Sequence, residues 1–192
     1  ELYNGWWFPA GSIVRGANCK RKISLANCFS RDTEFITDLG VKTFNDYSNG
    51  DIVNILTNFG NYVNGIVRNF GIQKLYKLIV QRYTVRKEVF CTFDHLWRTL
   101  NNNENIIKKT TSQLQKGNLL PFTNWKNYQK TLRIKKIRKN WKVVSVEETN
   151  RLEEVWCVEV PKYENFTLSQ GLNTHNCTTI SLGSLLDNQE WD

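Results

Sequence analysis

Two short segments near opposite ends of the chain hold residue types that can break and rejoin peptide bonds. The first is Asn27-Cys28, where a thiol directly follows a backbone carbonyl. Attack of the Cys28 thiolate on the carbonyl of Asn27 would convert the peptide bond into a thioester. The leaving amine then needs a proton, and the tetrahedral oxyanion needs a hydrogen-bond donor. We expect His95 to supply the proton and Thr92 to donate through its hydroxyl or its backbone N–H.

The second segment is His175-Asn176-Cys177. The side-chain amide of Asn176 can attack its own backbone carbonyl, which closes a succinimide ring and breaks the chain after Asn176. We expect His175 to polarise that carbonyl or to shuttle the proton. Cys177, directly after the break, is placed to accept an acyl group from the first thioester before the chain is cut.

Each of these residues also has a purely structural interpretation. Cys28 alone fits a small buried hydrophobic residue, His95 a core histidine, and Asn176 a turn. The order and spacing of all of them together favour the chemical interpretation. Cys157 lies in the apolar run 155–160 and is either a further site residue or a buried strand residue. Cys91, beside Thr92, is predicted to be core.

The elements that must position these residues are predicted to be short strands. Runs rich in β-branched and aromatic residues recur every 8–12 residues and are separated by turn signals such as Asn69-Phe70-Gly71. This pattern predicts a compact all-β fold. We expect a polar loop or short helix at Thr99–Lys108. The predicted strands are Glu34–Ile36, Val41–Phe44, Asp51–Leu56, Tyr62–Val67, Lys74–Val80, Val89–Thr92, Ile134–Val146, Val155–Val160 and Phe166–Leu168.

Composition limits the class of protein. Apolar residues make up 40% of the 192 residues, which indicates a globular domain with a real core. The five cysteines are irregularly spaced, without a Cys-x-x-Cys pair, so we predict no disulfide framework, no metal site and a reducing cytoplasmic location. The sequence has no apolar run of 18 residues, so we predict no membrane span, and no signal-peptide pattern opens the chain. The absence of Met indicates a segment of a longer reading frame.

A net charge of +8 makes nucleic acid a partner to consider. A basic run at 133–142 includes Lys135, Lys136 and Arg138, with Trp141 interleaved. Such a run can contact phosphates and stack a base, but it more often forms the solvated face of a β-ribbon. We therefore expect no nucleic-acid partner.

Taken together, the motifs resemble those of inteins, which are self-splicing proteins of the Hint (hedgehog/intein) fold. The first motif of that family begins with a nucleophile, the second reads Thr-x-x-His, and the last reads His-Asn followed by Cys, Ser or Thr. The matching residues are Cys28, Thr92, His95, the strand around Phe166, His175, Asn176 and Cys177. Both histidines of the chain fall on family positions.

The resemblance implies a Hint horseshoe of short strands and an excised segment of 149 residues, 28–176. It implies that the segment acts on its own flanks, 1–27 and 177–192, as a monomeric, single-turnover catalyst without cofactor. Cys28 would form the thioester, Cys177 would take over the acyl group, and cyclisation of Asn176 would release the segment. The stretch 96–154 is too short for a homing endonuclease, so the chain resembles a mini-intein.

Two positions depart from the family pattern. Cys157 stands where Asp is common, and Glu164 stands where a His often precedes the segment Asn165-Phe166. Cys157 is expected to donate a proton or to steer Cys28, as Cys does in some members. The loss of the second histidine leaves His175 as the expected helper of Asn176.

The flanks, read as one sequence, resemble the large subunit of ribonucleoside-diphosphate reductase. The residues that support this resemblance are the Trp7-Phe8-Pro9-Ala10 stretch and the joined Asn27–Cys177. The host would then be a ribonucleotide reductase. Three alternatives stay open: a self-cleaving Hint domain that does not ligate, a Cys-His hydrolase that acts on other peptides, and a basic β-module that binds nucleic acid.

Overall fold

The computed structural model describes residues 22–25, 28–101, 105–123, 140–160, 162–176 and 178–181. The chain separates into two compact units. One unit spans Ala26–Cys177, and the other combines the flanks Glu1–Leu25 and Thr178–Asp192. Each unit is considered by itself below.

The described part of the larger unit is built from antiparallel strands, which confirms the all-β prediction. Twelve strands form one sheet in the order β13-β12-β3-β5-β6-β7-β2-β11-β10-β8-β9, with β4 beside β3. Three short 3₁₀ turns, η1 (Phe44–Asp46), η2 (Thr111–Gln113) and η3 (Ser169–Gly171), lie between strands. The strands are β2 (Phe29–Ser30), β3 (Glu34–Thr37), β4 (Gly40–Thr43), β5 (Ile52–Leu56), β6 (Tyr62–Arg82), β7 (Val85–Thr92), β8 (Leu96–Leu100), β9 (Ile106–Thr110), β10 (Leu119–Leu120), β11 (Trp141–Glu159), β12 (Asn165–Leu168) and β13 (Leu172–His175).

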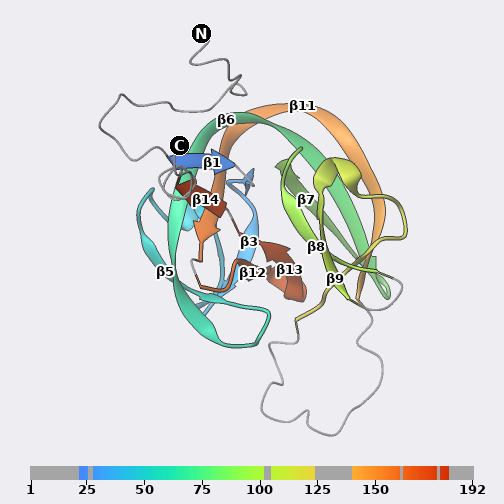
Figure 1. Ribbon diagram of the computed structural model, residues 1–192, viewed down its shortest axis with the longest axis horizontal. Coiled ribbons are helices and arrows are strands. Elements are labelled where there is room, and N and C mark those ends of the chain that lie inside the picture. The colour runs from blue at the N-terminus through green and yellow to red at the C-terminus, as the bar shows by residue number, and fades with distance from the viewer. Residues whose placement is uncertain are drawn as a thin grey trace, which may run out of the picture. The chain divides into compact units, whose positions relative to one another are not determined.

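Two of these strands are much longer than predicted. Figure 1 shows β6 and β11 as a long curved ribbon between the β3–β5 side and the β7–β9 side. The predicted turn at Asn69-Phe70-Gly71 is wrong, because β6 continues through it. Gly71 has a φ of +76°, and its N–H donates to the Asn69 side chain at 2.7 Å. The turn residues therefore bend a continuous strand, since both halves pair with the same partner, β11.

The prediction of a polar loop or short helix at Thr99–Lys108 is wrong at both ends of that range, which are strands. β8 runs to Leu100 and pairs with β9 from Ile106, so a hairpin replaces the expected loop or helix. The asparagines Asn101 and Asn105 lie between the two strands, where the Asn101 N–H donates to the Asn105 carbonyl at 3.0 Å.

The core of the larger unit lies under the strands that carry the candidate site residues. Phe29 of β2 contacts Trp97 of β8 and Phe166 of β12 edge-to-face, with ring centroids 5.9 and 6.0 Å apart. Phe35 of β3 packs against Phe166 as well. All four side chains are fully buried, and each such burial contributes about 1.5–3 kcal/mol. The aromatic cluster thereby holds β2, β8 and β12 together.

The β12–β13 hairpin carries the C-terminal candidate residues. β12 pairs with β3, and β13 packs against β8. Gly171 in the turn between them has a φ of +78°, and a Cβ there would overlap the Thr123 carbonyl oxygen and the Phe122 ring. Only glycine fits this turn without displacing the chain.

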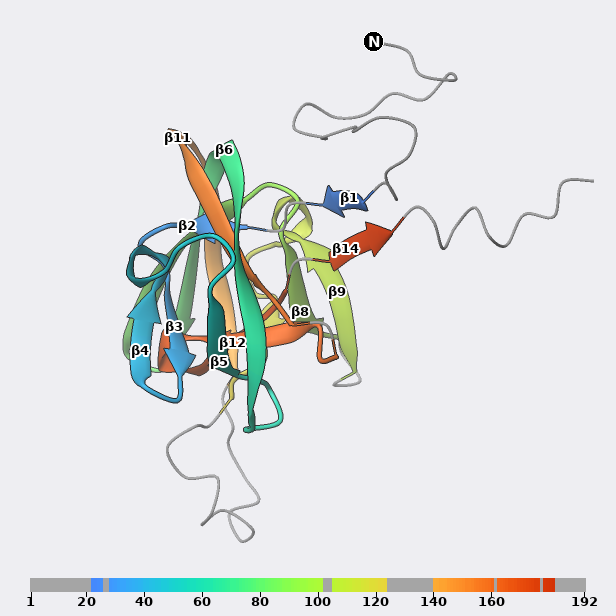
Figure 2. The same ribbon diagram turned by 90° about the vertical axis from the view of Figure 1, so that its left-hand side faces the viewer.

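The flank unit is described only over its two strands. β1 (Lys22–Leu25) pairs antiparallel with β14 (Thr178–Ser181), and Leu25 is opposite Thr178 (Figure 2). The backbone segments just outside the two candidate junctions are therefore hydrogen-bonded partners.

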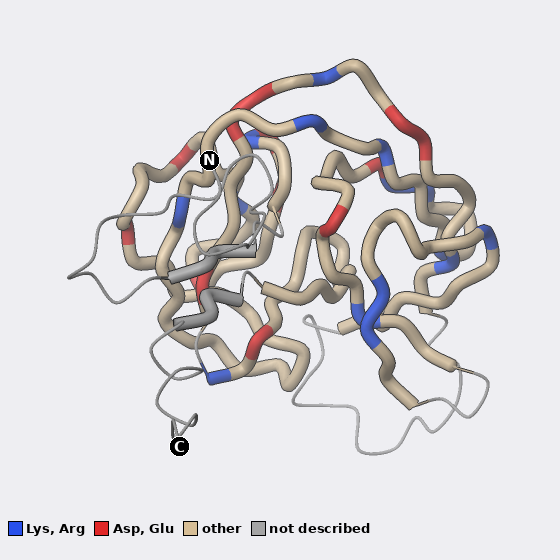
Figure 3. Tube along the Cα trace, turned by 45° about the horizontal axis from the view of Figure 1, so that its top comes forward, with Lys and Arg blue, Asp and Glu red and all other residues tan. Residues whose placement is uncertain are grey.

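Charged residues line the long ribbon, all of them basic on β6 and most of them acidic on β11 (Figure 3). Arg68 of β6 pairs with Glu159 of β11 at 3.0 Å, and Lys74 of β6 pairs with Glu148 of β11. Trp141 is 1% exposed, so it cannot stack a base as the nucleic-acid alternative requires. Lys135, Lys136 and Arg138 lie outside the described residues. Among the described residues, no helix is long and apolar enough to cross a membrane.

Candidate active site

Cys28 is fully buried directly before β2 and is held against Thr92 at the end of β7. The Cys28 N–H donates to Thr92 Oγ1 at 3.2 Å, and the Thr92 N–H donates to the Cys28 carbonyl at 2.9 Å. The pairing of Phe29 with Cys91 brings the two strands into this register. Both groups through which Thr92 is expected to act, its hydroxyl and its N–H, are therefore hydrogen-bonded to the backbone of Cys28.

His95 follows Thr92 by one tight turn and is also fully buried. Its N–H donates to the Thr92 carbonyl at 3.2 Å. The imidazole lies between Phe29 and Trp97, with ring centroids 4.2 and 4.8 Å away. Its Nε2 lies 2.7 Å from Oγ1 of Thr174 on β13. His95 is thus locked in orientation by two aromatic rings and one hydroxyl.

At the other end, His175 lies beside the backbone carbonyl that would be broken. Its Nδ1 is 2.7 Å from the carbonyl oxygen of Asn176. A carbonyl oxygen only accepts hydrogen bonds, so Nδ1 carries the proton and polarises that carbonyl. The pairing of His175 with Asn165 across the β12–β13 hairpin sets the position of the ring.

Asn176 is held by two hydrogen bonds, which its side-chain and backbone nitrogens donate. Its Nδ2 donates to the Val160 carbonyl at 3.1 Å, and its N–H donates to the Glu164 carbonyl at 3.1 Å. The Asn176 Oδ1 is buried and has no hydrogen-bond partner among the described residues. Glu164 has a φ of +51°, unusual for a non-glycine residue, and this conformation lets its carbonyl face Asn176. Both the backbone and the side chain that would cyclise are therefore constrained.

The Glu164 side chain lies near the ring of His175. Its Oε2 is 3.6 Å from His175 Nε2 and 3.3 Å from Lys108 Nζ of β9. The nearby Lys108 lowers the pKa of Glu164, which keeps it ionised. Burial lowers the pKa of His175, because the charged ring loses water; the Asn176 carbonyl and Glu164 oppose this shift, and Lys108 and Arg98 add to it. His175 is accordingly neutral at pH 7, with its proton on Nδ1.

Cys157 of β11 lies close to Cys28. Trp156 is paired with Phe29, so the same antiparallel register continued by one residue puts Cys157 opposite Cys28. Cys157 is fully buried, and its Sγ donates to the Val158 carbonyl at 3.7 Å. Cys91 is buried on β7, and burial raises the pKa of its thiol to about 12, so it remains a protonated core residue.

The structure thus links residues from both ends of the larger unit through one path of hydrogen bonds. The path runs from Cys28 through Thr92, His95, Thr174 and His175 to Asn176. Cys177 and Asn27 lie outside the described residues. Sequence reasoning missed Thr174, Val160 and Lys108. Thr174 could have been noticed as the neighbour of His175, whereas a backbone carbonyl such as that of Val160 leaves no signal in a sequence.

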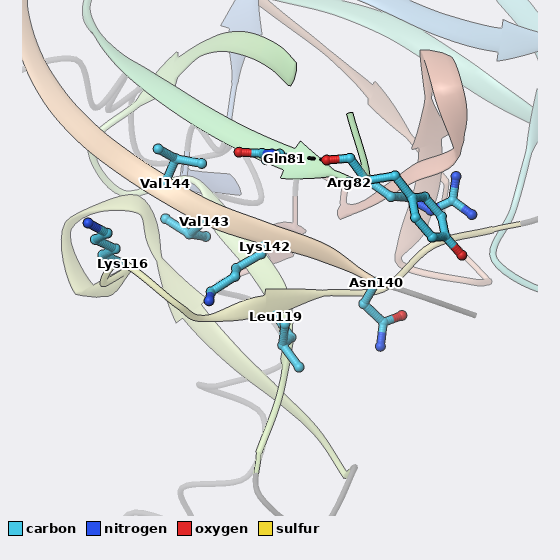
Figure 4. Close-up of a pocket in the computed structure, with 9 residues that line it drawn as sticks. Gln81, Arg82, Lys116, Leu119, Asn140, Lys142, Val143 and Val144 are labelled. Atoms are coloured by element: carbon cyan, nitrogen blue, oxygen red, sulfur yellow. Dashed lines mark hydrogen bonds between the residues drawn. The ribbon is translucent and has the colours of Figure 1, made fainter. Parts of the chain in front are cut away.

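A cavity of about 730 Å³ opens elsewhere, between β6, β11 and the turn before β10. Figure 4 shows Lys116, Lys142 and Arg82 around it, and none of the predicted site residues lines it. Over the described ranges, no cluster of three or more Cys, His, Asp or Glu side chains is arranged to hold a metal ion.

Comparisons with known proteins bear on the fold. No family model and no curated protein sequence matches the chain. Among solved structures, a DnaB intein from Synechocystis sp. PCC 6803 is similar with a TM-score of 0.58 and 18% identity, covering 78% of this chain and 97% of that one. The gp41-1 intein is similar with a TM-score of 0.53 and 22% identity, covering 78% and 98%. The MchDnaB-1 intein is similar with a TM-score of 0.53 and 18% identity, covering 77% of this chain and 99% of that one.

These likenesses span nearly the whole length of each intein. They agree with the antiparallel all-β sheet observed here. The chain therefore has the Hint fold of inteins.

Proposed function

We propose that the chain is a self-splicing mini-intein, in which residues 28–176 excise themselves and join Asn27 to Cys177. The observation that carries this proposal is the series of hydrogen bonds that connects Cys28, residue by residue, to Asn176. These two residues lie near opposite ends of the sequence, and a purely structural role for either gives no reason for such a path.

The first step is the attack of the Cys28 Sγ on the carbonyl carbon of Asn27. The C–N bond to Cys28 breaks, a C–S bond forms, and the freed amine takes a proton. The Thr92 Oγ1 accepts a hydrogen bond from that nitrogen at 3.2 Å, and its hydroxyl donates to the oxyanion in this proposal. His95 supplies the proton, and Cys157, opposite Cys28 in the sheet register, assists the thiol.

In the second step the Cys177 thiol takes the acyl group, which passes from Cys28 Sγ to Cys177 Sγ. The third step releases the segment. Asn176 Nδ2 attacks its own carbonyl carbon, which His175 Nδ1 polarises at 2.7 Å. A C–N bond closes the ring, the bond to Cys177 breaks, and the proton lost by Nδ2 passes to the Cys177 nitrogen. The Val160 carbonyl orients Nδ2 for this attack. The freed amine of Cys177 then takes over the acyl group from its own sulfur, giving an Asn27–Cys177 peptide bond.

Two further observations support the boundaries of this reaction. The compact unit Ala26–Cys177 nearly coincides with the proposed segment 28–176. The pairing of Leu25 with Thr178 keeps the two flanks together, which favours ligation over simple cleavage. As part of the same proposal, the segment acts on its own flanks as a cytoplasmic monomer, without cofactor, membrane or nucleic acid. The host of the flanks is a ribonucleotide reductase large subunit.

The test is to express the chain between two distinguishable tags under reducing conditions and to weigh the products over time. Splicing predicts a ligated product joined at Asn27–Cys177 and a released 149-residue segment with a C-terminal succinimide. Asn176→Ala is expected to stop at a thioester that added thiol cleaves, and Cys28→Ala is expected to lose cleavage before residue 28. Persistence of the intact chain would contradict the proposal. Cleaved but unjoined flanks would instead indicate a self-cleaving Hint domain.

A further inference from the structure

Thr174 is a buried polar residue for which packing alone gives no reason. It is fully buried on β13, opposite Phe166 of β12. A buried hydroxyl is costly unless it is hydrogen-bonded, and valine has the same shape without that cost. The hydroxyl lies 2.7 Å from Nε2 of His95 and donates to the carbonyl of His175 at 3.3 Å.

We propose that Thr174 is the positioning residue of His95, and that it couples the acid–base group of the first junction to the strand that carries the second. This inference rests on the proposed function. His95 and Thr174 are 79 positions apart, and their hydrogen bond is the link in the path that joins the β7–β8 side to the β12–β13 hairpin.

A hydroxyl suits a histidine that must both hold and release a proton. When Nε2 is protonated, Thr174 Oγ1 accepts from it and donates its own hydrogen to the His175 carbonyl. When Nε2 is bare, the hydroxyl can rotate and donate to it. A carboxylate at this place would instead favour a permanently charged ring. Thr174 therefore keeps the His95 ring in one orientation while the ring exchanges a proton through its other nitrogen.

The same contact makes the first reaction depend on the placement of β13. His175 is the next residue of that strand, and its Nδ1 bonds the carbonyl of Asn176. When β13 is seated so that His175 reaches its carbonyl, Thr174 also reaches His95. The expected consequence is that loss of the hydroxyl slows thioester formation at Cys28 while cyclisation of Asn176 continues.

The chain offers a matched control in the same hairpin. Thr167 of β12 is also fully buried, and its hydroxyl has no hydrogen-bond partner among the described residues. Thr167→Val and Thr174→Val make the same chemical change at equal burial. Only the second removes a contact to His95.

The experiment measures thiol-induced cleavage before residue 28 in an Asn176→Ala background, and cleavage after Asn176 in a Cys28→Ala background. Thr174→Val is expected to slow cleavage before residue 28 about 5- to 30-fold, the loss expected for one buried hydrogen bond. The rate of cleavage after Asn176 should change less than about twofold. Thr174→Ser should restore the rate of cleavage before residue 28, and Thr167→Val should leave both cleavage rates unchanged.

A second readout does not need activity. In the Cys28→Ala, Asn176→Ala double variant, the ring ¹⁵N shifts of His95 should move with Thr174→Val and not with Thr167→Val. An unchanged first rate together with unchanged ring shifts would overturn the role of Thr174, as would an equal slowing of both junctions. If the Asn176→Ala chain with Thr174 intact forms no thiol-sensitive bond, the proposed function itself fails, and the coupling fails with it.

Discussion

The two candidate junctions are built in different surroundings. Around Cys28, the partners described above are buried and include no carboxylate or ammonium group: Thr92 at the end of a strand, His95 between two aromatic rings, and the hydroxyl of Thr174. Around Asn176, the buried His175 lies beside Glu164, whose carboxylate is 55% exposed and paired with Lys108. The first centre is enclosed in the sheet, and the second opens toward charged side chains at the surface.

This difference separates what controls each step. In the enclosed centre, geometry decides the reaction, because the hydroxyl groups and aromatic rings around the imidazole and the thiol can only position them. In the open centre, the charge of His175 depends on burial and on three nearby ionised groups, Glu164, Lys108 and Arg98. The first junction should therefore respond mainly to changes in packing, and the second to changes in nearby charge and in salt concentration.

The strongest test of the division removes the acid–base group of the enclosed centre. His95→Gln keeps a polar side chain of similar size but cannot act as an acid near pH 7. Thiol-induced cleavage before residue 28, measured in the Asn176→Ala background, should fall about 10²- to 10⁴-fold. Cleavage after Asn176 in the Cys28→Ala background should stay within about threefold. Equal losses at both junctions would contradict the separation.

The next test strains the turn that supports β13, the strand that carries His175. Gly171→Ala forces a Cβ against the Thr123 carbonyl and the Phe122 ring at a left-handed φ, so it should cost about 2–4 kcal/mol of unfolding free energy. Denaturant unfolding of the Cys28→Ala, Asn176→Ala variant measures this. Gly50→Ala is the control, since φ is also positive there but its Cβ would meet nothing within 4 Å. Equal costs at both sites would show that the contact under the hairpin is unimportant.

Removing the carboxylate beside His175 tests whether nearby charge controls the second junction. The Glu164 carboxylate raises the pKa of His175, so Glu164→Gln should lower that pKa further. An NMR titration of the His175 ring in the same inactive double variant measures the change. Glu34→Gln, on strand β3, serves as the control. An unchanged His175 titration in Glu164→Gln would mean that solvent screens the 3.6 Å contact completely.

The smallest effect concerns a contact between β7 and the turn before β13. Lys87 Nζ donates to the carbonyl and the hydroxyl of Ser169, and burial lowers the pKa of Lys87 to about 8. Because the folded protein binds this proton less tightly than the unfolded chain does, the Lys87 contribution to stability should rise between pH 8 and its ordinary pKa of 10.5. Lys87→Met should remove that rise in urea-unfolding curves at several pH values. A parallel pH dependence in both proteins would contradict the assignment.

Much of the fold was predictable because runs of β-branched and aromatic residues separated by turn signals mark strands. Strands at Glu34, Val41, Ile52 and Phe166 lie where the β-type runs predicted them. The continuous ribbon was not predictable, since Asn69-Phe70-Gly71 has the composition of a chain reversal. It becomes a bend only because β11 pairs with β6 on both sides of it.

For the site, the sequence by itself determined which groups carry the chemistry. Thiol, imidazole and amide side chains are covalent properties, so the choice of Cys28, His95, His175 and Asn176 follows from residue types and their order along the chain. Only the tertiary structure decided how they are connected. The contact of Thr174 with His95, the Val160 carbonyl at Asn176 and the neutral state of His175 all depend on strand register and burial. These properties arise between segments distant in sequence, where no local pattern records the distance between two atoms.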